Sequence, residues 1–176
     1  MKEKITSTEE IFNGKLLHIV KHEVELPDGN TSIREVVQHP GAVAVVAVDD
    51  DHQVLLVRQF RLPADAILYE IPAGILEPGE KPEDCAAREL REETGYRPLT
   101  LNAIGGMYTA PGYTTEFIHI FHATGYEEAP LEQDVDEFVE AQRIPMTEAL
   151  AMIERGEIVD GKSMTGLLQV ARILGI

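Results

Sequence analysis

Cysteine is nearly absent from this 176-residue chain: the single cysteine, Cys85, excludes an internal disulfide and fits a reducing compartment. We expect it to be a small helix residue rather than a reactive thiol. Tryptophan is absent, so stacking on a planar ring would come from tyrosine, phenylalanine or histidine. No apolar run approaches a membrane span, and no secretory signal opens the sequence. We therefore expect a cytoplasmic protein without a membrane partner.

Basic residues are also scarce. The chain has 15 lysines and arginines against 31 aspartates and glutamates, which gives a formal net charge of −16. Nucleic acid is therefore excluded as an expected partner, because binding of its phosphates requires a basic surface. An anionic small substrate would need cations or a few arginines to reverse the field locally, which favours a metal-assisted site. The length fits one domain with a sizeable core and a short N-terminal addition.

A helix is predicted from Pro82 to Thr94. Proline suits the first helical position, and Gly95 suits the left-handed cap that ends a helix. Glu83 and Asp84 lie in the first turn, where negative charge complements the helix dipole. The local signals therefore define both ends of this helix.

The predicted helix has three glutamates, Glu89, Glu92 and Glu93, close together on one side. Like charges at such spacings repel one another by about 0.2–0.5 kcal/mol per pair, so the cluster suits either a solvated face or a divalent cation. Carboxylate oxygens are hard ligands that suit magnesium, manganese or calcium. Arg88 lies one turn after Asp84 and one turn before Glu92, and we expect it to pair with both. Helix geometry alone leaves both interpretations of the cluster open.

The surrounding segment has a recognisable spacing. Gly74 is followed after five residues by Glu80, and after seven more by the run Arg88-Glu89-Leu90-Arg91-Glu92-Glu93-Thr94-Gly95-Tyr96. This signature segment, residues 74–96, resembles that of the Nudix hydrolases at every position that specifies glycine or a polar residue. The last position, Tyr96, is usually aliphatic in that family, a departure that concerns packing rather than chemistry. The resemblance implies a metal-dependent hydrolase that cleaves a diphosphate linked to a nucleoside.

The resemblance also implies an α/β fold, namely a Nudix-type α/β/α sandwich around a mixed sheet, and it assigns roles in the site. Mg²⁺, with Mn²⁺ as the alternative, would be held by Glu89 and Glu93, with help from Glu92 and the backbone carbonyl of Ala73. Glu92 and Glu93 are by the same resemblance catalytic residues. The residues with a structural role in the signature segment are Gly74, Glu80, Arg88 and Gly95.

Two arginines precede the signature segment, in Arg58-Gln59-Phe60-Arg61 at the end of a predicted strand. Their guanidiniums could clamp a diphosphate or pair with the surplus acids, and the sequence alone favours ion pairs. The resemblance favours Arg61 as a substrate contact, because Arg-Gln-Phe-Arg before Glu-x-Pro-Ala-Gly is typical of members that act on ADP-ribose. Arg58 is a second candidate. Glu70 either binds a polar group of the substrate or balances a neighbouring arginine.

Two loops after the signature segment complete the candidate site. Pro111, Gly112 and Glu116 resemble the marker of ADP-ribose and sugar-nucleotide pyrophosphatases, although an ordinary hairpin loop has the same composition. A second, acidic loop ends near residue 137. In similar enzymes a glutamate from this loop helps to activate water. The candidates for this catalytic base, in order of preference, are Glu137 and then Asp134 or Asp136.

Residues 1–40 are expected to form an N-terminal hairpin, with strands at 15–26 and 31–38 joined by the turn Pro27-Asp28-Gly29-Asn30. A hairpin alone is only marginally stable, and the resemblance implies that it helps to form a homodimer. Residues 41–176 would form the Nudix domain. Its predicted strands and helices are 42–48, 53–60, 99–108, 117–123, 147–155 and 161–174.

The two C-terminal helices have their own local signals. Thr147 is predicted as the N-cap of the first, and Gly156 lies just past its end. The second helix is amphipathic. Its predicted apolar side consists of Leu167, Leu168, Val170, Ala171 and Leu174.

The leading hypothesis is hydrolysis of ADP-ribose or a related nucleoside diphosphate sugar to a nucleoside monophosphate and a sugar phosphate. GDP-mannose or another hexose nucleotide is the alternative substrate, because residues 156–162 resemble that branch of the family as well. A non-catalytic domain that binds a nucleotide sugar is a rival, but it would be expected to have lost acids of the signature segment. An acidic metal-binding or interaction module is a further rival, which the complete spacing of the signature segment disfavours.

Overall fold

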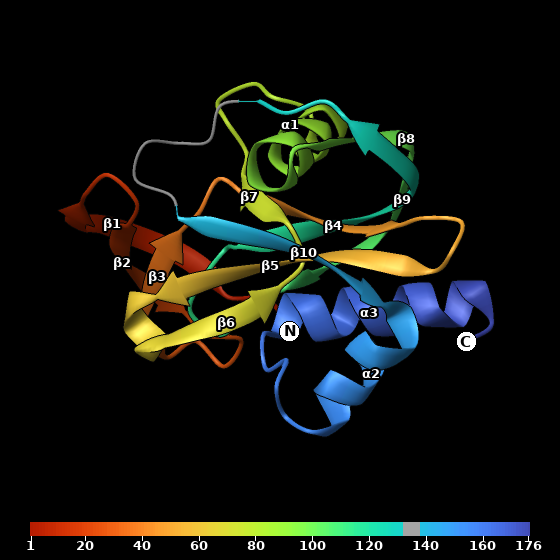
Figure 1. Cartoon of the computed structure of the whole chain (residues 1–176). Coiled ribbons are helices and arrows are strands. Elements are labelled where there is room, and N and C mark those ends of the chain that lie inside the picture. Colours follow the sequence, from red (N-terminus) through yellow and green to blue (C-terminus); the bar gives the residue numbers. More distant parts are fainter. Residues whose placement is uncertain (132–137) are drawn as a thin grey trace. The chain divides into compact units, whose positions relative to one another are not determined.

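The computed structural model describes residues 1–131 and 138–176 and divides into two compact units. The first unit consists of residues 1–41 and 108–117, and the second of residues 42–107 and 118–176. Figure 1 labels the helices and strands of both.

The first unit contains a three-stranded antiparallel sheet in the order β1-β2-β3. Its strands are β1 (Lys4–Asn13), β2 (His18–Glu25) and β3 (Thr31–Gln38). The predicted hairpin is confirmed, because β2 and β3 pair along their whole length across a turn in which Gly29 has a φ of +86°. Strand β1 is not expected from the sequence. All of its residues are exposed, so it has no hydrophobic periodicity to detect.

The second unit is organised around a mixed sheet in the order β10-β5-β4-β9-β8, with β6 paired to β5 and β7 paired to β4. Strands β4 and β9 run parallel, whereas β5 pairs antiparallel with both β10 and β6. The prediction of a mixed sheet is confirmed. The strands are β4 (Ala42–Val48), β5 (Gln53–Arg61), β6 (Ala66–Glu70), β7 (Ala73–Ile75), β8 (Tyr96–Tyr108), β9 (Phe117–Glu128) and β10 (Val139–Pro145).

Helices cover both faces of this sheet. Helix α1 (Pro82–Thr94) lies on one face, and α2 (Met146–Glu154) and α3 (Gly161–Leu174) lie on the other (Figure 1). The side chains of β4 alternate between them: Val43 and Val45 pack in a cluster with residues of α1, whereas Ala44 and Val46 pack in a cluster with residues of α2 and α3. This arrangement confirms the α/β/α sandwich and explains why β4 is a continuous apolar run.

Two details of the C-terminal helices differ from the prediction. Helix α2 begins at Met146 with Pro145 in the cap position, so the assignment of Thr147 as N-cap is wrong. Met146 is buried and donates its N–H to the carbonyl of His52 (2.9 Å), so a tertiary contact rather than a side-chain cap starts the helix. Leu168 is 55% exposed, and its place on the packed side of α3 is taken by Gly166, where a Cβ would lie 2.8 Å from Val46.

Candidate active site

The start and the end of α1 follow the sequence closely. Pro82 occupies the first turn after Lys81, whose backbone is extended. At the other end Gly95 adopts a left-handed conformation, with φ +79°, and its N–H donates to the carbonyl of Arg91 (2.9 Å). Both predicted boundaries are confirmed, so Glu89, Glu92 and Glu93 all lie within the helix.

Arg88 is the hub of the acidic face. Its guanidinium donates two hydrogen bonds to Glu80, at 2.9 and 3.0 Å, and one each to Glu89 (2.6 Å) and Glu92 (2.8 Å). The predicted pair with Glu92 is confirmed, but Glu80 takes the place predicted for Asp84. These hydrogen bonds raise the pKa of Arg88 above its ordinary value, and Glu80 is the largest cause. Arg88 therefore fixes two acids of the cluster and the loop before the helix.

Glu80 supports that loop from within. Its carboxylate accepts the N–H of Glu77 (3.1 Å) as well as the two bonds from Arg88. Chiefly because of Arg88, the pKa of Glu80 falls to about 2. The structural role assigned to Glu80 remains a prediction that stability measurements can test.

We expect Glu80→Gln to lower the free energy of unfolding at pH 7 by about 1–2 kcal/mol, because the ion pair with Arg88 becomes a hydrogen bond between a cation and a neutral amide. The folded-state pKa lies below the unfolded one, so the contribution of Glu80 is present above pH 4.5 and is lost as the pH falls towards 2. Urea unfolding at several pH values checks this. The difference between wild type and variant should shrink below pH 4.5, and a difference that grows there would contradict the assignment. Glu154→Gln, an exposed acid of α2, is the control.

Two acids of the cluster, Glu93 and Glu89, lie against β7. Glu93 is 4% exposed, and its carboxylate accepts the N–H of Ala73 (3.0 Å). Glu89 lies over Gly74, where an added Cβ would be only 1.9 Å from the carboxyl carbon of Glu89. A solvated face does not require such contacts. The buried position of Glu93 and the close approach of Glu89 show that the acidic side of α1 faces the protein.

Cys85 lies on the buried side of α1 and is not a reactive group. Its thiol is fully buried and contacts the carbonyl of Ile75 (3.6 Å). Burial raises its pKa to about 12, so the thiolate is scarce at neutral pH. The prediction of a small helix residue is confirmed.

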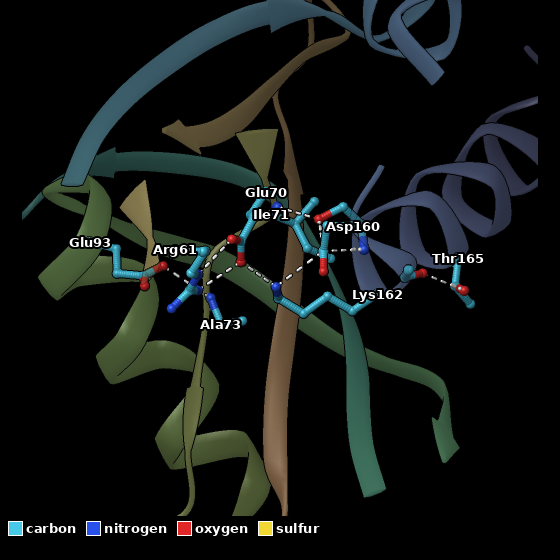
Figure 2. A network of polar contacts seen from close by, with 10 residues as sticks. Arg61, Glu70, Ile71, Ala73, Glu93, Asp160, Lys162 and Thr165 are labelled. Carbon is cyan, nitrogen blue, oxygen red and sulfur yellow. Dashed lines mark hydrogen bonds and ion pairs between the residues drawn. The ribbon is translucent and has the colours of Figure 1, made fainter. Parts of the chain in front are cut away.

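A second network lies at the start of the signature segment (Figure 2). Arg61 donates two hydrogen bonds to Glu70, both 2.7 Å, through Nε and Nη2. The ammonium of Lys162 also contacts Glu70 and lies 3.1 Å from Asp160. Burial alone would raise the pKa of Glu70, but hydrogen bonds and charges from Arg61 and Lys162 hold it below its ordinary value. Of the two roles considered for Glu70, the balancing of an arginine is the one that the structure displays.

Lys162 and Asp160 are participants that sequence reasoning missed. Asp160 is the N-cap of α3 and accepts the N–H of Ser163 (3.0 Å), while the hydroxyl of Ser163 accepts the N–H of Ile71 (2.8 Å). The Asp-Gly-Lys-Ser sequence could have indicated Asp160 as the N-cap of the predicted helix 161–174, because aspartate is a favoured N-cap. No local signal names Glu70, 92 residues away from Lys162, as the partner.

Arg58 has different partners from Arg61. It forms an ion pair with Glu140 of β10 (3.0 Å) and stacks over the ring of Tyr69 at 5.5 Å from its centroid. The ion-pair interpretation therefore describes Arg58 in this structure, and its predicted substrate contact stays a prediction.

The marker residues Pro111, Gly112 and Glu116 belong to the first unit. Glu116 accepts the hydroxyl of Thr109 (2.7 Å) and lies 3.7 Å from the ring of His39. Backbone bonds between Val37 and the 113–115 segment, at 2.8 and 3.0 Å, attach this loop to β3. Within their unit these three residues thus form an ordered loop, and their role in substrate binding stays a prediction.

The predicted base Glu137 and its substitutes Asp134 and Asp136 lie outside the described residues. The chain on either side of them is anchored to elements of the site. Ala129 exchanges hydrogen bonds with the end of α1, because its carbonyl accepts from Arg91 and its N–H donates to Gly95, both at 2.9 Å. On the other side Val139 pairs with Gln59 of β5.

Within residues 1–131 and 138–176, no three or more histidine, cysteine, aspartate or glutamate side chains are arranged around a common metal position. Glu89 and Glu92 instead share Arg88, and Glu93 binds the N–H of Ala73. The donor chemistry nevertheless fits a hard divalent cation, because carboxylates and a backbone carbonyl are oxygen ligands. The cradle at Gly74, which a Cβ would fill, leaves room for the carboxylate of Glu89 beside β7.

Two family models match the chain. The NUDIX domain model matches residues 38–165, and the model of the nucleoside diphosphate sugar hydrolase N-terminal domain matches residues 3–37. No helix in the described part of the chain is long and apolar enough to cross a membrane.

Several curated proteins are similar over nearly the whole chain. An ADP-ribose pyrophosphatase of Bacillus subtilis is 46% identical over 165 residues, which cover 93% of this chain and 89% of that protein. A methanol dehydrogenase activator of Bacillus methanolicus is 42% identical with the same coverage. A GDP-mannose pyrophosphatase of Yersinia enterocolitica is 36% identical over 181 residues, covering 95% and 94%.

A solved structure has the same fold. The crystal structure of an ADP compounds hydrolase matches with a TM-score of 0.90 and covers 99% of this chain and 95% of that one. The sequences are 23% identical, so this likeness concerns the fold.

Proposed function

The chain belongs to the Nudix hydrolase family, and we propose that it hydrolyses the diphosphate bond of ADP-ribose or a related nucleoside diphosphate sugar. The products would be a nucleoside monophosphate and a sugar phosphate. The observation that carries this proposal is the acidic face of α1 held on β7, where the buried carboxylate of Glu93 accepts the N–H of Ala73. The names of the relatives, among them an ADP-ribose pyrophosphatase at 46% identity, support the substrate class.

Each group has a distinct task in this proposal. Glu89 and Glu93 would hold magnesium, or manganese, with help from Glu92 and the Ala73 carbonyl. When bound, the ion supplies charge neutralisation of the diphosphate and a lower pKa of water. Arg88 fixes Glu89 and Glu92 in place. These tasks require a charged carboxylate at Glu89, Glu92 and Glu93.

The substrate and the water would be oriented by groups outside α1. Arg61 would bind the diphosphate, with Arg58 as a further candidate, and Glu137 would orient or deprotonate the attacking water, with Asp134 and Asp136 as substitutes. The anchors of the flanking chain at α1 and β5 support a base from this segment. Pro111, Gly112 and Glu116 would contribute to substrate selection.

GDP-mannose is the second candidate substrate, favoured by the relative of that name at 36% identity over 95% of this chain. A purely regulatory role is also considered, because a relative at 42% identity is named an activator of another enzyme. The intact set Glu89, Glu92 and Glu93 favours catalysis over such a role.

Product analysis separates these functions. The wild-type protein would be incubated with magnesium and with ADP-ribose, ADP-glucose, GDP-mannose, NADH or a diadenosine polyphosphate, and the products would be identified by chromatography. We expect AMP and ribose 5-phosphate from ADP-ribose at the highest kcat/KM. Faster cleavage of GDP-mannose would select the alternative, and no cleavage of any compound would favour the regulatory role.

We propose further that the protein is a homodimer. Strand β1 exposes Ile5, Ile11 and Phe12, each more than half accessible, and it lies at the edge of its sheet. An exposed apolar strand edge favours association, and a second copy would cover it. Light scattering after size exclusion should give twice 19.5 kDa, and Phe12→Glu should shift it towards the monomer. A wild-type monomer at micromolar concentration would reject the dimer.

The compartment proposed is the cytoplasm. Cys85 is a free cysteine with a buried thiol, which agrees with a reducing environment. Cell fractionation with an antibody against the protein tests this, and recovery from a secreted fraction would contradict it.

A further inference from the structure

Glu70 is a buried acid whose charge is shared by two cations. The residue is 2% exposed, so its carboxylate would be strongly disfavoured without compensation. Arg61, at the end of β5, binds both oxygens of this carboxylate. Lys162, in the first turn of α3, binds Oε2 as well. Figure 2 shows the two cations reaching Glu70 from different sides.

The guanidinium of Arg61 has a hydrogen-bond donor that Glu70 does not use. Its hydrogen bonds to Glu70 use Nε and Nη2, and Nη1 donates to no residue in the described part of the chain. Its side chain is 40% exposed, whereas that of Glu70 is almost fully covered. The guanidinium is thus held along one edge and open along the other. Such a group suits the oxygens of a diphosphate, which accept hydrogen bonds from a planar fork.

Lys162 is placed to act on Glu70 rather than on solvent. Its side chain is 12% exposed, and its ammonium lies between Glu70 and Asp160. Asp160 is itself held as the N-cap of α3, and Ser163 of the same turn accepts the N–H of Ile71 (2.8 Å). The start of α3 is therefore bound at two points to adjacent residues of the segment leading into the signature, which gives the ammonium a defined position.

We propose that Lys162 is a positioning residue for the diphosphate of the substrate and acts through Glu70 on Arg61. The inference rests on the proposed function. The ammonium stabilises the buried carboxylate in its charged form and in one orientation. Glu70 in turn holds the guanidinium of Arg61 with its free edge outward before the substrate arrives. A preoriented arginine binds more tightly because less conformational freedom is lost on binding.

Steady-state kinetics on ADP-ribose test this role. Lys162→Met should raise KM about tenfold and change kcat by less than about threefold, because substrate binding loses its preoriented cation while the acids of α1 are untouched. Lys162→Arg, which keeps the charge, should recover most of the loss. Thr165→Ala is the matched control: it removes a bond of the same helical turn, from Thr165 to the carbonyl of Gly161 (2.8 Å), and should leave KM unchanged.

A double-mutant cycle distinguishes positioning from direct contact with the substrate. Glu70→Gln should raise KM by itself. Adding Lys162→Met to it should raise KM by less than about twofold further, because the carboxylate through which Lys162 acts on Arg61 is already gone. A full additional tenfold increase would overturn the proposal. If Lys162→Met fails to fold by circular dichroism, Lys162→Gln is used in the same cycle.

Different results would overturn the positioning role of Lys162 and the proposed function. Wild-type turnover of ADP-ribose with an unchanged KM in the folded Lys162→Met variant would overturn the positioning role and leave the proposed function standing. A wild-type protein that cleaves no nucleotide sugar would overturn both.

Discussion

Glu93→Gln is expected to lower kcat by about two to three orders of magnitude while the fold stays intact. The substitution is nearly isosteric. The glutamine carbonyl can still accept the N–H of Ala73, so the contact between α1 and β7 is retained. What is lost is the negative charge at a position that is 4% exposed. The substitution is therefore expected to impair metal binding and the chemical step, and not the fold.

Magnesium titrations of kcat, together with circular dichroism and thermal unfolding, check this expectation. The same change at Glu83, an exposed acid in the first turn of α1, is the control and should leave turnover near the wild-type value. If Glu93→Gln retained near-wild-type activity at saturating magnesium, the assignment of Glu93 as a metal ligand would be wrong. A loss of activity accompanied by unfolding would instead assign Glu93 a structural role.

The parts of the fold that follow from local chemistry are predictable from the sequence. Helix α1 has the predicted bounds because proline and glycine mark its ends. Strand β4 has the predicted bounds because it is covered on both faces and so is apolar throughout. For α1 the determining residues lie within the helix and at its ends. For β4 both faces of the strand are covered, so every position is apolar.

The features that were not predicted from the sequence have a different cause, because each of them depends on residues distant in the sequence. Strand β1 pairs with β2, but none of its residues is buried, and its sequence shows no hydrophobic periodicity. The contact between Met146 and His52 starts α2 without a capping side chain. Arg88 was expected to find partners one helical turn away, and its strongest partner, Glu80, lies in the preceding loop.

The acidic cluster of α1 shows which features of the site can be predicted from the sequence and which cannot. The spacing of Glu89, Glu92 and Glu93 predicts that they share a side of α1, but it does not distinguish a solvated face from a functional one. The decisive features are tertiary: Glu93 is buried on β7, and Glu89 lies against Gly74. The lysine that completes the charge around Glu70 comes from α3, so no motif around Glu70 could have indicated it.

Gly74→Ala is expected to separate function from stability. A Cβ at this position would lie 1.9 Å from the carboxyl carbon of Glu89, so the carboxylate must move. The displaced group is the end of a flexible side chain, and the backbone of Gly74 does not have a positive φ. The free energy of unfolding should therefore change by no more than about 1 kcal/mol. Activity or apparent magnesium affinity should fall about 10–100-fold, because a ligand is moved from its position.

Chemical denaturation and magnesium-dependent kinetics on the same preparation measure the two effects. Gly161→Ala is the control, because a Cβ at that position meets nothing within 4 Å. The variant should also be tested in a Glu89→Gln background, where displacing the side chain should cost little further activity, since its charge is already gone. Normal magnesium dependence in Gly74→Ala would show that Glu89 does not need its place over β7. A large loss of stability would show that the glycine serves the packing of α1 rather than the position of an acid.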